Sequence, residues 1–273
     1  LTTTRSSVAR QRRPSRPGKP PPDPRRIQRL LLGDEAVALG ALHAGLSAAY
    51  AYPGTPSTEI LEYLIEKASH DEPITAMWCT NEKTAYEQGL GVSMAGKRAL
   101  VAMKHVGLNV ALDPFMSSAL VAIHGGLVVA VADDPGMNSS QNEQDSRCLA
   151  DFAHILCLEP STQQEAYDMA RDAFELSEHF RVPVLIRLVT RLAHSRSVVT
   201  TDPPQDPNPV SKTPQANDWN LLPVFSRRLW RELLDEQVQL QAYTERCRYT
   251  PLSLADGSDG LGVITTGIAH NYY

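Results

Sequence analysis

Three polar side chains fall just beyond predicted strand ends, where they could act together on a ligand. Thr55 lies in the stretch YAYPGTPSTEI, residues 50–60, after an apolar run typical of a strand. Glu82 follows a short strand-like run ending near Trp78, and His105 follows the run VAMK. Ligands of open α/β sheets bind at the carboxyl edge of the strands. We therefore expect Thr55, Glu82 and His105 to crowd one edge of the sheet.

Two of these residues also have an ordinary structural interpretation. Asn81 is a typical helix N-cap, and Glu82 is then an acid in the first helical turn, where the helix dipole favours it. His105 can be a solvated loop histidine. On residue type alone, these interpretations are the default.

The turn around Thr55 is stiff. Pro53 and Pro56 fix two φ angles and remove two backbone donors, while Gly54 permits a tight reversal. A helix should begin directly afterwards, with Ser57 or Thr58 as its N-cap. A stiff polar turn at a strand end favours a role in holding a ligand.

Strand-like and helix-like runs alternate from about residue 30 to 190. This alternation predicts an α/β fold, with a mostly parallel sheet and helices on both faces. Helices are expected over residues 34–46, 57–68, 82–94 and 163–178, and strands over 47–52, 74–78, 99–103, 127–132 and 182–189. We expect a domain over 30–197, a Pro-rich linker over 198–224, and then, over 225–273, a helix (225–246) and the truncated start of a further α/β domain, with a strand over 260–267.

Composition is that of an ordinary globular protein, with 42% hydrophobic and 21% charged residues among 273. The net charge is −5, although residues 1–29 carry nine basic residues and one acidic residue. The rest of the chain is therefore strongly acidic, which argues against nucleic acid as the main partner. The basic segment 1–29 contains six prolines and is predicted to be a disordered leader.

No signal peptide or membrane span is predicted, because the longest apolar stretch, residues 119–132, is interrupted by His124 and two glycines. The four cysteines are scattered, with no CxxC pair. They are expected to be reduced thiols in a cytoplasmic protein, and they encode no zinc or iron–sulfur site in this stretch.

Two further patterns could suggest chemistry, and for each the structural interpretation is favoured. GVSMAGKR, residues 91–98, nearly matches a P-loop, but Arg98 replaces the hydroxyl residue and the segment continues a helix, so it predicts a helix end at Gly96. Four acids follow the strand at 127–132 and could bind a cation, but capping of the following turn and helix is favoured. These acids are Asp133, Asp134, Glu143 and Asp145.

Several long blocks of the sequence resemble the alpha subunits of indolepyruvate:ferredoxin oxidoreductases. These enzymes belong to the thiamine diphosphate-dependent 2-oxoacid:ferredoxin oxidoreductase family. The resemblance covers roughly residues 31–197, and GVITTGIAHNYY at 262–273 is similar to the start of the next domain. The blocks include YPGTPSTEI, NEKTAYEQGLGVSMAGKRALVAMKHVGLNVALDPFMS, GGLVVAVADDPGMNSSQNEQD, EPSTQQEAYDMARDAFELSE and PVLIRLVTRLAHS.

This resemblance implies roles for particular residues. Residues 30–197 would form the pyrimidine-binding domain, and Glu82 would hydrogen-bond a ring nitrogen of the cofactor's aminopyrimidine. The turn Pro53-Gly54-Thr55 would face cofactor and substrate, with the Thr55 hydroxyl directed at the 2-oxo acid. A substrate-side loop would contain Lys104, His105 and Asn109.

The implied reaction is oxidative decarboxylation of an arylpyruvate to an arylacetyl-CoA, with electrons passed to ferredoxin. The partners would be coenzyme A, ferredoxin and a beta subunit or its fused equivalent. The GDG…N motif for Mg²⁺ and the cysteine runs for 4Fe-4S clusters are absent from this sequence. Both groups are therefore expected in a missing C-terminal part, no metal ligands are predicted here, and this chain alone is expected to be inactive.

Two alternatives stay open. A related enzyme could act on pyruvate, 2-oxoglutarate or a branched-chain 2-oxo acid, although the block MKHVGLNVALDP favours the indolepyruvate type. A chain that ended at Tyr273 could instead be a non-catalytic interaction module.

Overall fold

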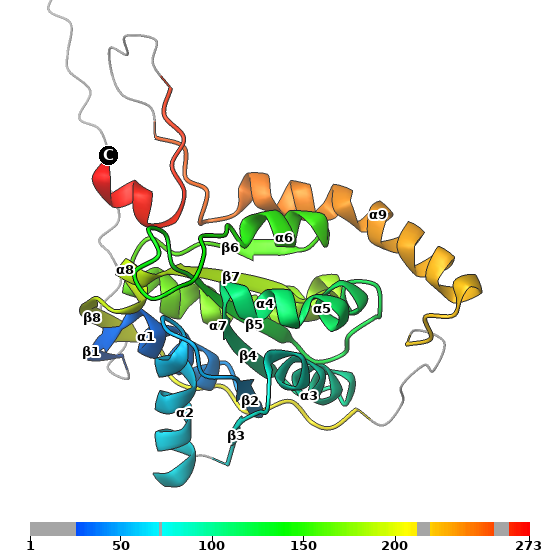
Figure 1. The fold of residues 1–273 in the computed structure, drawn as a ribbon, viewed down its shortest axis with the longest axis horizontal. Coiled ribbons are helices and arrows are strands. Elements are labelled where there is room, and N and C mark those ends of the chain that lie inside the picture. Colours follow the sequence, from blue (N-terminus) through cyan, green and yellow to red (C-terminus); the bar gives the residue numbers. More distant parts are fainter. Residues whose placement is uncertain (1–25, 71–72, 212–218, 254–261) are drawn as a thin grey trace, which may run out of the picture.

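A six-stranded parallel sheet is the centre of the computed structural model, which describes residues 26–70, 73–211, 219–253 and 262–273 (Figure 1). The strand order is β3-β2-β4-β5-β7-β6, and every neighbouring pair is parallel. The bounds are β2 Ala48–Ala51, β3 Thr75–Trp78, β4 Ala99–Lys104, β5 Leu127–Asp133, β6 Leu156–Leu158 and β7 Val184–Val189. The predicted fold class is confirmed.

The central strands are buried along their whole length, and mostly apolar, because helices cover both of their faces. All residues of β4, β5 and β7 are buried, which is typical of a parallel sheet between two helical layers. The chain runs outward from β2 to the edge strand β3 and then crosses back to β4 on the other side of β2. The carboxyl ends of β2 and β4 therefore flank the topological switch point, where ligands of such sheets bind.

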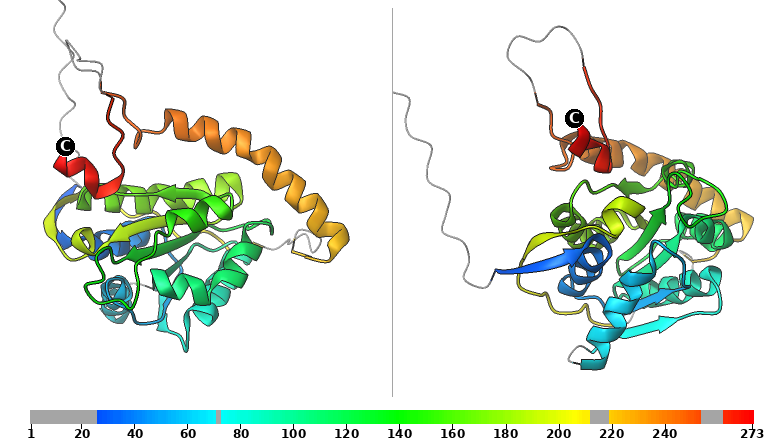
Figure 2. Two further views of the ribbon diagram at one scale, coloured as in Figure 1. Left: turned by 45° about the horizontal axis from the view of Figure 1, so that its top comes forward. Right: turned by 60° about the vertical axis from the view of Figure 1, so that its left-hand side comes forward.

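The helices form two groups, which right-handed crossovers place on opposite faces of the sheet (Figure 2). In one group α1 packs against α2 and α7, and in the other α3 packs against α4 and α5. Their bounds are α1 Gly33–His43, α2 Thr58–His70, α3 Glu82–Met94, α4 His105–Val110, α5 Leu112–Ser118 and α7 Gln163–Phe180. Two shorter helices, α6 (Arg147–Phe152) and α8 (Thr190–Ala193), follow β5 and β7.

A second, two-stranded sheet corrects the predicted leader and linker. β1 (Ile27–Leu32) pairs antiparallel with β8 (Arg196–Thr201) along its whole length. The prediction of disorder is therefore wrong for the last residues of 1–29, and residues 1–25 lie outside the described part. The linker predicted over 198–224 likewise begins as a strand. The pairing joins segments that are far apart in the sequence, so a local sequence pattern could not predict it.

The rest of the predicted linker packs against the domain as extended chain. Gln205 N donates to His43 O at 2.9 Å, and Ser211 N donates to Ala95 O at 2.8 Å. Residues 212–218 lie outside the described part. Composition indicated a linker because prolines exclude helix and strand, but an extended segment can still be held by backbone hydrogen bonds.

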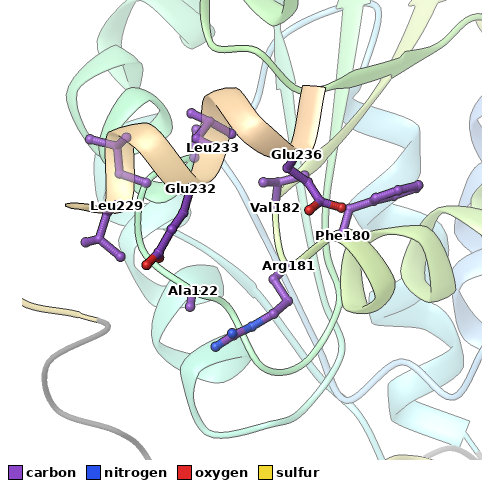
Figure 3. A pocket seen from close by; sticks show the side chains of 10 residues that line it. Ala122, Phe180, Arg181, Val182, Leu229, Glu232, Leu233 and Glu236 are labelled. Carbon is purple, nitrogen blue, oxygen red and sulfur yellow. The ribbon is translucent and has the colours of Figure 1, made fainter. Parts of the chain in front are cut away.

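The charged helix is confirmed as α9, Pro223–Arg246, which buries Leu229, Leu233 and Leu240. Beside it lies a cleft of about 270 Å³, lined by Leu229 and Leu233 and by Phe180 and Val182 just before β7 (Figure 3). That cleft is at the amino edge of the sheet, opposite the edge where ligands of parallel sheets bind.

The strand predicted over 260–267 is wrong where it can be assessed. Residues 254–261 lie outside the described part, 262–266 form no strand, and Gly267–Tyr272 form a 3₁₀ helix, η2. The apolar run GVIT meets no partner strand in the described part of the chain, and a strand needs one to satisfy its backbone groups.

Other expectations agree with the structure. All four cysteines are free. The near-P-loop segment is the end of α3, with Gly96 at a φ of 87°, as expected at a helix C-terminus. Across the described ranges, no helix is both long and apolar enough to cross a bilayer.

Candidate cofactor site

The turn after β2 is held by its own hydrogen bonds. The Ser57 amide and hydroxyl both donate to Gly54 O, at 2.9 and 2.8 Å, and Gly54 N donates to Thr58 Oγ1 at 3.1 Å. The helix α2 begins at Thr58, as the N-cap prediction required. Thr55 lies at the exposed tip of this turn and its peptide bond to Pro56 is cis. The turn therefore presents Thr55 to solvent from a rigid base.

Glu82 is the first residue of α3. Asn81 caps that helix by accepting a hydrogen bond from Thr84 N at 2.8 Å, which confirms its predicted role. The Glu82 side chain is half-buried, and its carboxylate accepts no hydrogen bond from any residue that the structure describes. Its oxygens therefore remain available to a ligand.

The predicted loop of Lys104, His105 and Asn109 is instead the end of β4 followed by the helix α4. Lys104 Nζ donates to Ser139 O at 2.8 Å, and His105 Nε2 lies 3.1 Å from Asn142 O. His105 is only 1% exposed, and its Nδ1 is buried without a partner among the described residues. The expectation of a solvated loop histidine is therefore wrong, because the segment after β5 folds over it.

Two glycines bring these elements into contact. A Cβ at Gly54 would lie 3.2 Å from Lys104 Cβ, so the turn after β2 rests directly on the end of β4. A Cβ at Gly107 would lie 2.6 Å from Glu82 Oε1, so α4 rests directly on the Glu82 side chain. The structure thus joins Gly54 to Lys104 and Glu82 to the His105 helix at the switch point, as the strand-end argument predicts.

The structure does not bring every candidate into contact. Pro53, Thr55 and Asn109 are exposed on this edge and make no side-chain hydrogen bond within the described ranges. Gly107 was not among the predicted site residues, although a glycine inside a helix is a usable signal for close packing. Ser139 and Asn142 were also missed, because both act through backbone carbonyls, which side-chain patterns cannot reveal.

The segment after β5 is organised by Asp134. The carboxylate accepts hydrogen bonds from Ser139 N (2.7 Å), Ser140 Oγ (2.6 Å), Asn138 Nδ2 (3.1 Å) and Thr190 Oγ1 (2.7 Å). Burial alone would raise the pKa of Asp134, but these bonds, led by that from Ser140, hold the pKa well below its ordinary value. Asp134 therefore fixes the segment that covers Lys104 and His105.

The three other acids of this region also form ion pairs or hydrogen bonds with other residues of the protein. Asp133 pairs with Arg187 Nε at 2.6 Å, Asp145 pairs with Arg147 Nη2 at 2.7 Å, and Glu143 accepts from Gly136 N at 2.9 Å. The capping interpretation agrees with Asp134, Glu143 and Asp145, which accept hydrogen bonds from the backbone N–H groups of Ser139, Gly136 and Arg147, whereas Asp133 also pairs across the sheet with Arg187.

We expect Asp134→Asn to lower the free energy of unfolding by about 1–3 kcal/mol at neutral pH, since a carboxylate accepts these bonds more strongly than an amide. A group with a lowered folded-state pKa stabilises above its unfolded pKa, near 4, and that contribution is lost as pH falls through the folded value. The wild type should therefore lose more stability than the variant between about pH 5 and pH 2. Urea unfolding against pH, with exposed Asp151→Asn as control, checks this, and parallel curves would contradict it.

Comparison with known proteins places this arrangement in a family. The model described as pyruvate flavodoxin/ferredoxin oxidoreductase, thiamine diphosphate-binding, matches residues 39–229. The chain belongs to this family. The resemblance drawn from the sequence blocks is thereby confirmed.

Similar curated proteins are subunits of two kinds of 2-oxoacid oxidoreductase. The indolepyruvate oxidoreductase subunit IorA of Pyrococcus abyssi is 42% identical over 253 residues, covering 89% of this chain and 38% of that protein. IorA of Archaeoglobus fulgidus is 40% identical over 247 residues, with 89% and 39% covered. The ketoisovalerate oxidoreductase subunit VorB of Methanothermobacter marburgensis is 28% identical over 171 residues, with 58% and 46% covered.

A solved structure supports the fold. The 2-oxoglutarate:ferredoxin oxidoreductase of Magnetococcus marinus, determined with 2-oxoglutarate, coenzyme A and succinyl-CoA bound, superposes with a TM-score of 0.65 at 20% identity, covering 79% of this chain and 45% of that one. The matches cover between 38% and 46% of the length of these proteins, so the chain spans less than half of each.

Proposed function

We propose that this family member forms the aminopyrimidine side of a thiamine diphosphate site in a 2-oxoacid:ferredoxin oxidoreductase of the indolepyruvate type. The observation that carries the proposal is the Glu82 carboxylate, which is half-buried at the switch point, lies against Gly107 and accepts no hydrogen bond from the described protein. A protonated ring nitrogen of a bound heterocycle would satisfy it by donating its N–H. The residues present therefore fit the cofactor that the family binds.

Glu82 would hold a proton between its carboxyl group and the aminopyrimidine ring. When bound, thiamine diphosphate supplies the nucleophilic carbon and the electron sink for decarboxylation. The protein's part is to keep the proton at one ring nitrogen, so that the neighbouring exocyclic nitrogen can act as a base. Because α3 begins at Glu82 and Asn81 caps it, the carboxyl group is placed by a rigid helix end.

The Thr55 hydroxyl would donate a hydrogen bond to the 2-oxo acid. The hydrogen bonds of Gly54 to Ser57 and Thr58 hold the turn in place without using the Thr55 side chain. Pro53 and Pro56 add stiffness, which lowers the cost of ordering the hydroxyl on binding.

The residues after β4 would form the substrate side of the site. The Lys104 amine is tied to Ser139 O, so this residue acts by positioning the segment above it. His105 has one ring nitrogen bonded to Asn142 O and one buried nitrogen free for a neighbour. Exposed Asn109 would reach a substrate or a neighbouring domain.

The proposed reaction converts an arylpyruvate to an arylacetyl-CoA and reduces ferredoxin, in a cytoplasmic enzyme. Mg²⁺ with the diphosphate site, 4Fe-4S clusters, and a beta subunit or its fused equivalent would come from parts beyond this sequence. The similarity to IorA at 42% identity favours arylpyruvate over the branched-chain 2-oxo acid suggested by VorB at 28%.

The test is the rate of ferredoxin-type dye reduction by the native full-length protein with its partner subunit. Indolepyruvate, ketoisovalerate, pyruvate and 2-oxoglutarate would be compared, with thiamine diphosphate and coenzyme A added or omitted. Highest kcat/KM for indolepyruvate, dependent on both additions, supports the proposal. Activity that is independent of thiamine diphosphate would overturn it.

We expect Gly107→Ala to remove most of the activity while leaving the fold intact. The new methyl group would lie 2.6 Å from Glu82 Oε1 and must push that side chain aside. Alanine otherwise suits a helix, and a flexible side chain yields at little cost, so the melting temperature should hardly change. Activity assays and thermal unfolding check this, with Gly91→Ala on α3, where a Cβ meets nothing within 4 Å, as control. Full activity in Gly107→Ala would contradict the placement of Glu82.

A further inference from the structure

A second polar cluster lies behind the turn that carries Thr55. It joins Asp34 in the first turn of α1, Glu59 in the first turn of α2, and His194 directly after α8. One ligand atom from each of these side chains lies within 4.8 Å of the others. His194 Nε2 is 3.4 Å from Glu59 Oε2. None of these residues was a predicted site residue.

Asp34 is the unusual member of this cluster. It is 0% exposed, and neither carboxylate oxygen has a hydrogen-bond partner among the described residues. Glu59 Oε2 is also buried and makes no hydrogen bond there. Burial of a carboxylate without a partner is costly, so such groups are normally paired or bound to a cation.

The charged groups that act on the Asp34 carboxyl are the acids Glu59 and Glu35, and no basic residue that the structure describes is among them. Glu35 is a further acid close to Asp34. Its Oε2 accepts a hydrogen bond from Leu32 N at 2.8 Å. Two carboxyl groups therefore lie beside one imidazole, and a third acid lies close to Asp34. A divalent cation would balance the excess negative charge.

The backbone holds the three elements in register. A Cβ at Gly33 would lie 2.3 Å from Leu192 O, so the start of α1 touches α8 directly. His194 N donates to Thr190 O at 3.1 Å, which fixes the residue after α8. The ligand atoms are thus presented by packed helix ends and not by a free loop.

We propose that Asp34, Glu59 and His194 bind one divalent transition-metal ion, with Zn²⁺ as the best match. Zn²⁺ binds carboxylate oxygen and imidazole nitrogen at about 2.0–2.2 Å in a tetrahedron, which separates ligand atoms by roughly 3.3–3.5 Å. The separation of 3.4 Å between His194 Nε2 and Glu59 Oε2 fits one edge of that tetrahedron. Mg²⁺ is a poorer match because it prefers oxygen ligands in an octahedron.

The ion would brace the turn of the candidate cofactor site. Glu59 is next to Thr58, whose Oγ1 accepts the hydrogen bond from Gly54 N. The ion would therefore connect α1 and α8 to the residue that holds the Thr55 turn. This site is separate from the Mg²⁺ proposed for the diphosphate, and it does not depend on the proposed reaction.

The competing interpretation is a proton shared by the two carboxyl groups. Burial, together with the charge of Glu59, raises the pKa of Asp34 well above its ordinary value, so a neutral Asp34 could donate to Glu59. A proton shared by Asp34 and Glu59 would occupy the oxygens that a metal ion needs. The metal site therefore predicts binding of Zn²⁺, and the shared proton predicts none.

The test uses the 273-residue chain, stripped with a chelator and titrated with ZnCl₂ by calorimetry, with metal content measured by mass spectrometry. One Zn²⁺ per chain is expected, with a rise in melting temperature that MgCl₂ does not reproduce. Asp34→Asn and His194→Gln should each weaken Zn²⁺ binding at least about 10-fold. The control is Glu62→Gln, because Glu62 is an exposed acid on α2, the helix that carries Glu59. This variant should bind Zn²⁺ as the wild type does.

Three results would overturn the metal site. The first is absence of stoichiometric Zn²⁺ binding, together with a stability gain in Asp34→Asn, as a shared proton predicts. The second is undiminished Zn²⁺ binding in both ligand variants. The third is equal stabilisation by Mg²⁺. His194 is exposed, so its replacement tests the site even if Asp34→Asn were to disturb folding.

Discussion

Glu82→Gln in the native full-length protein is expected to lower kcat by about 10² to 10⁴-fold, the range typical of a lost general acid or base. Glutamine keeps the shape of the side chain but cannot share a proton with the aminopyrimidine ring. The rate of dye reduction gives kcat, and exchange of the cofactor's acidic C–H proton, followed by NMR, isolates the step that Glu82 controls. Both rates should fall together, while the melting temperature stays near that of the wild type.

Glu87→Gln is the matched control, because Glu87 lies on the same helix with its side chain 54% exposed. Its activity should equal that of the wild type. If Glu82→Gln also retained full activity, Glu82 would have no part in the mechanism. If activity fell but proton exchange stayed fast, Glu82 would act on the substrate and not on the cofactor.

Arg187→Met is expected to lower the free energy of unfolding by about 3–5 kcal/mol, the usual cost of removing one partner from a buried ion pair. Arg187 lies in the middle of β7 with a 9% exposed side chain, and it pairs with fully buried Asp133 at 2.6 Å and with Glu159. Methionine keeps most of the apolar stem. The loss therefore reports mainly on Asp133, which would be left charged in the sheet and, among the described residues, with only the hydrogen bond from Ser146 N.

The double variant Asp133→Asn with Arg187→Met should recover part of that stability, because it removes the stranded charge. Urea unfolding of the two single variants and the double variant gives the coupling free energy. Lys83→Met breaks an exposed pair with Asp113 and should leave the midpoint unchanged. A loss in the double variant equal to the sum of the two single losses would show that the pair is not coupled.

Local pattern was a reliable guide to the elements of the parallel sheet. The apolar runs of β4, β5 and β7 were predicted within two residues, because strands buried on both faces are apolar at nearly every position. The helix α3 was predicted with its bounds, since Asn81 caps it and Gly96 ends it. In these segments the backbone preference and the burial pattern agree, so neighbours in sequence suffice.

Pattern failed where distant segments decide the outcome. β1 lies in a stretch that composition marked as disordered, and it forms only because β8 pairs with it across more than 160 residues of chain. His105 was expected to be solvated, and it is buried because the segment held by Asp134 folds over it. Sequence separation hides both contacts.

For the candidate site, residue type and position at strand ends predicted that Thr55, Glu82 and His105 share one edge of the sheet, and all three follow parallel strands of that sheet. Only the tertiary structure decided how they are supported. Gly54 rests on Lys104, Gly107 rests on Glu82, and Asp34, Glu59 and His194 meet from three separate helix ends. The sequence shows which residues carry acidic, basic or hydroxyl groups. Whether a glycine permits a close contact, or a carboxylate is buried without a partner, depends on the neighbouring atoms and is decided by the tertiary structure.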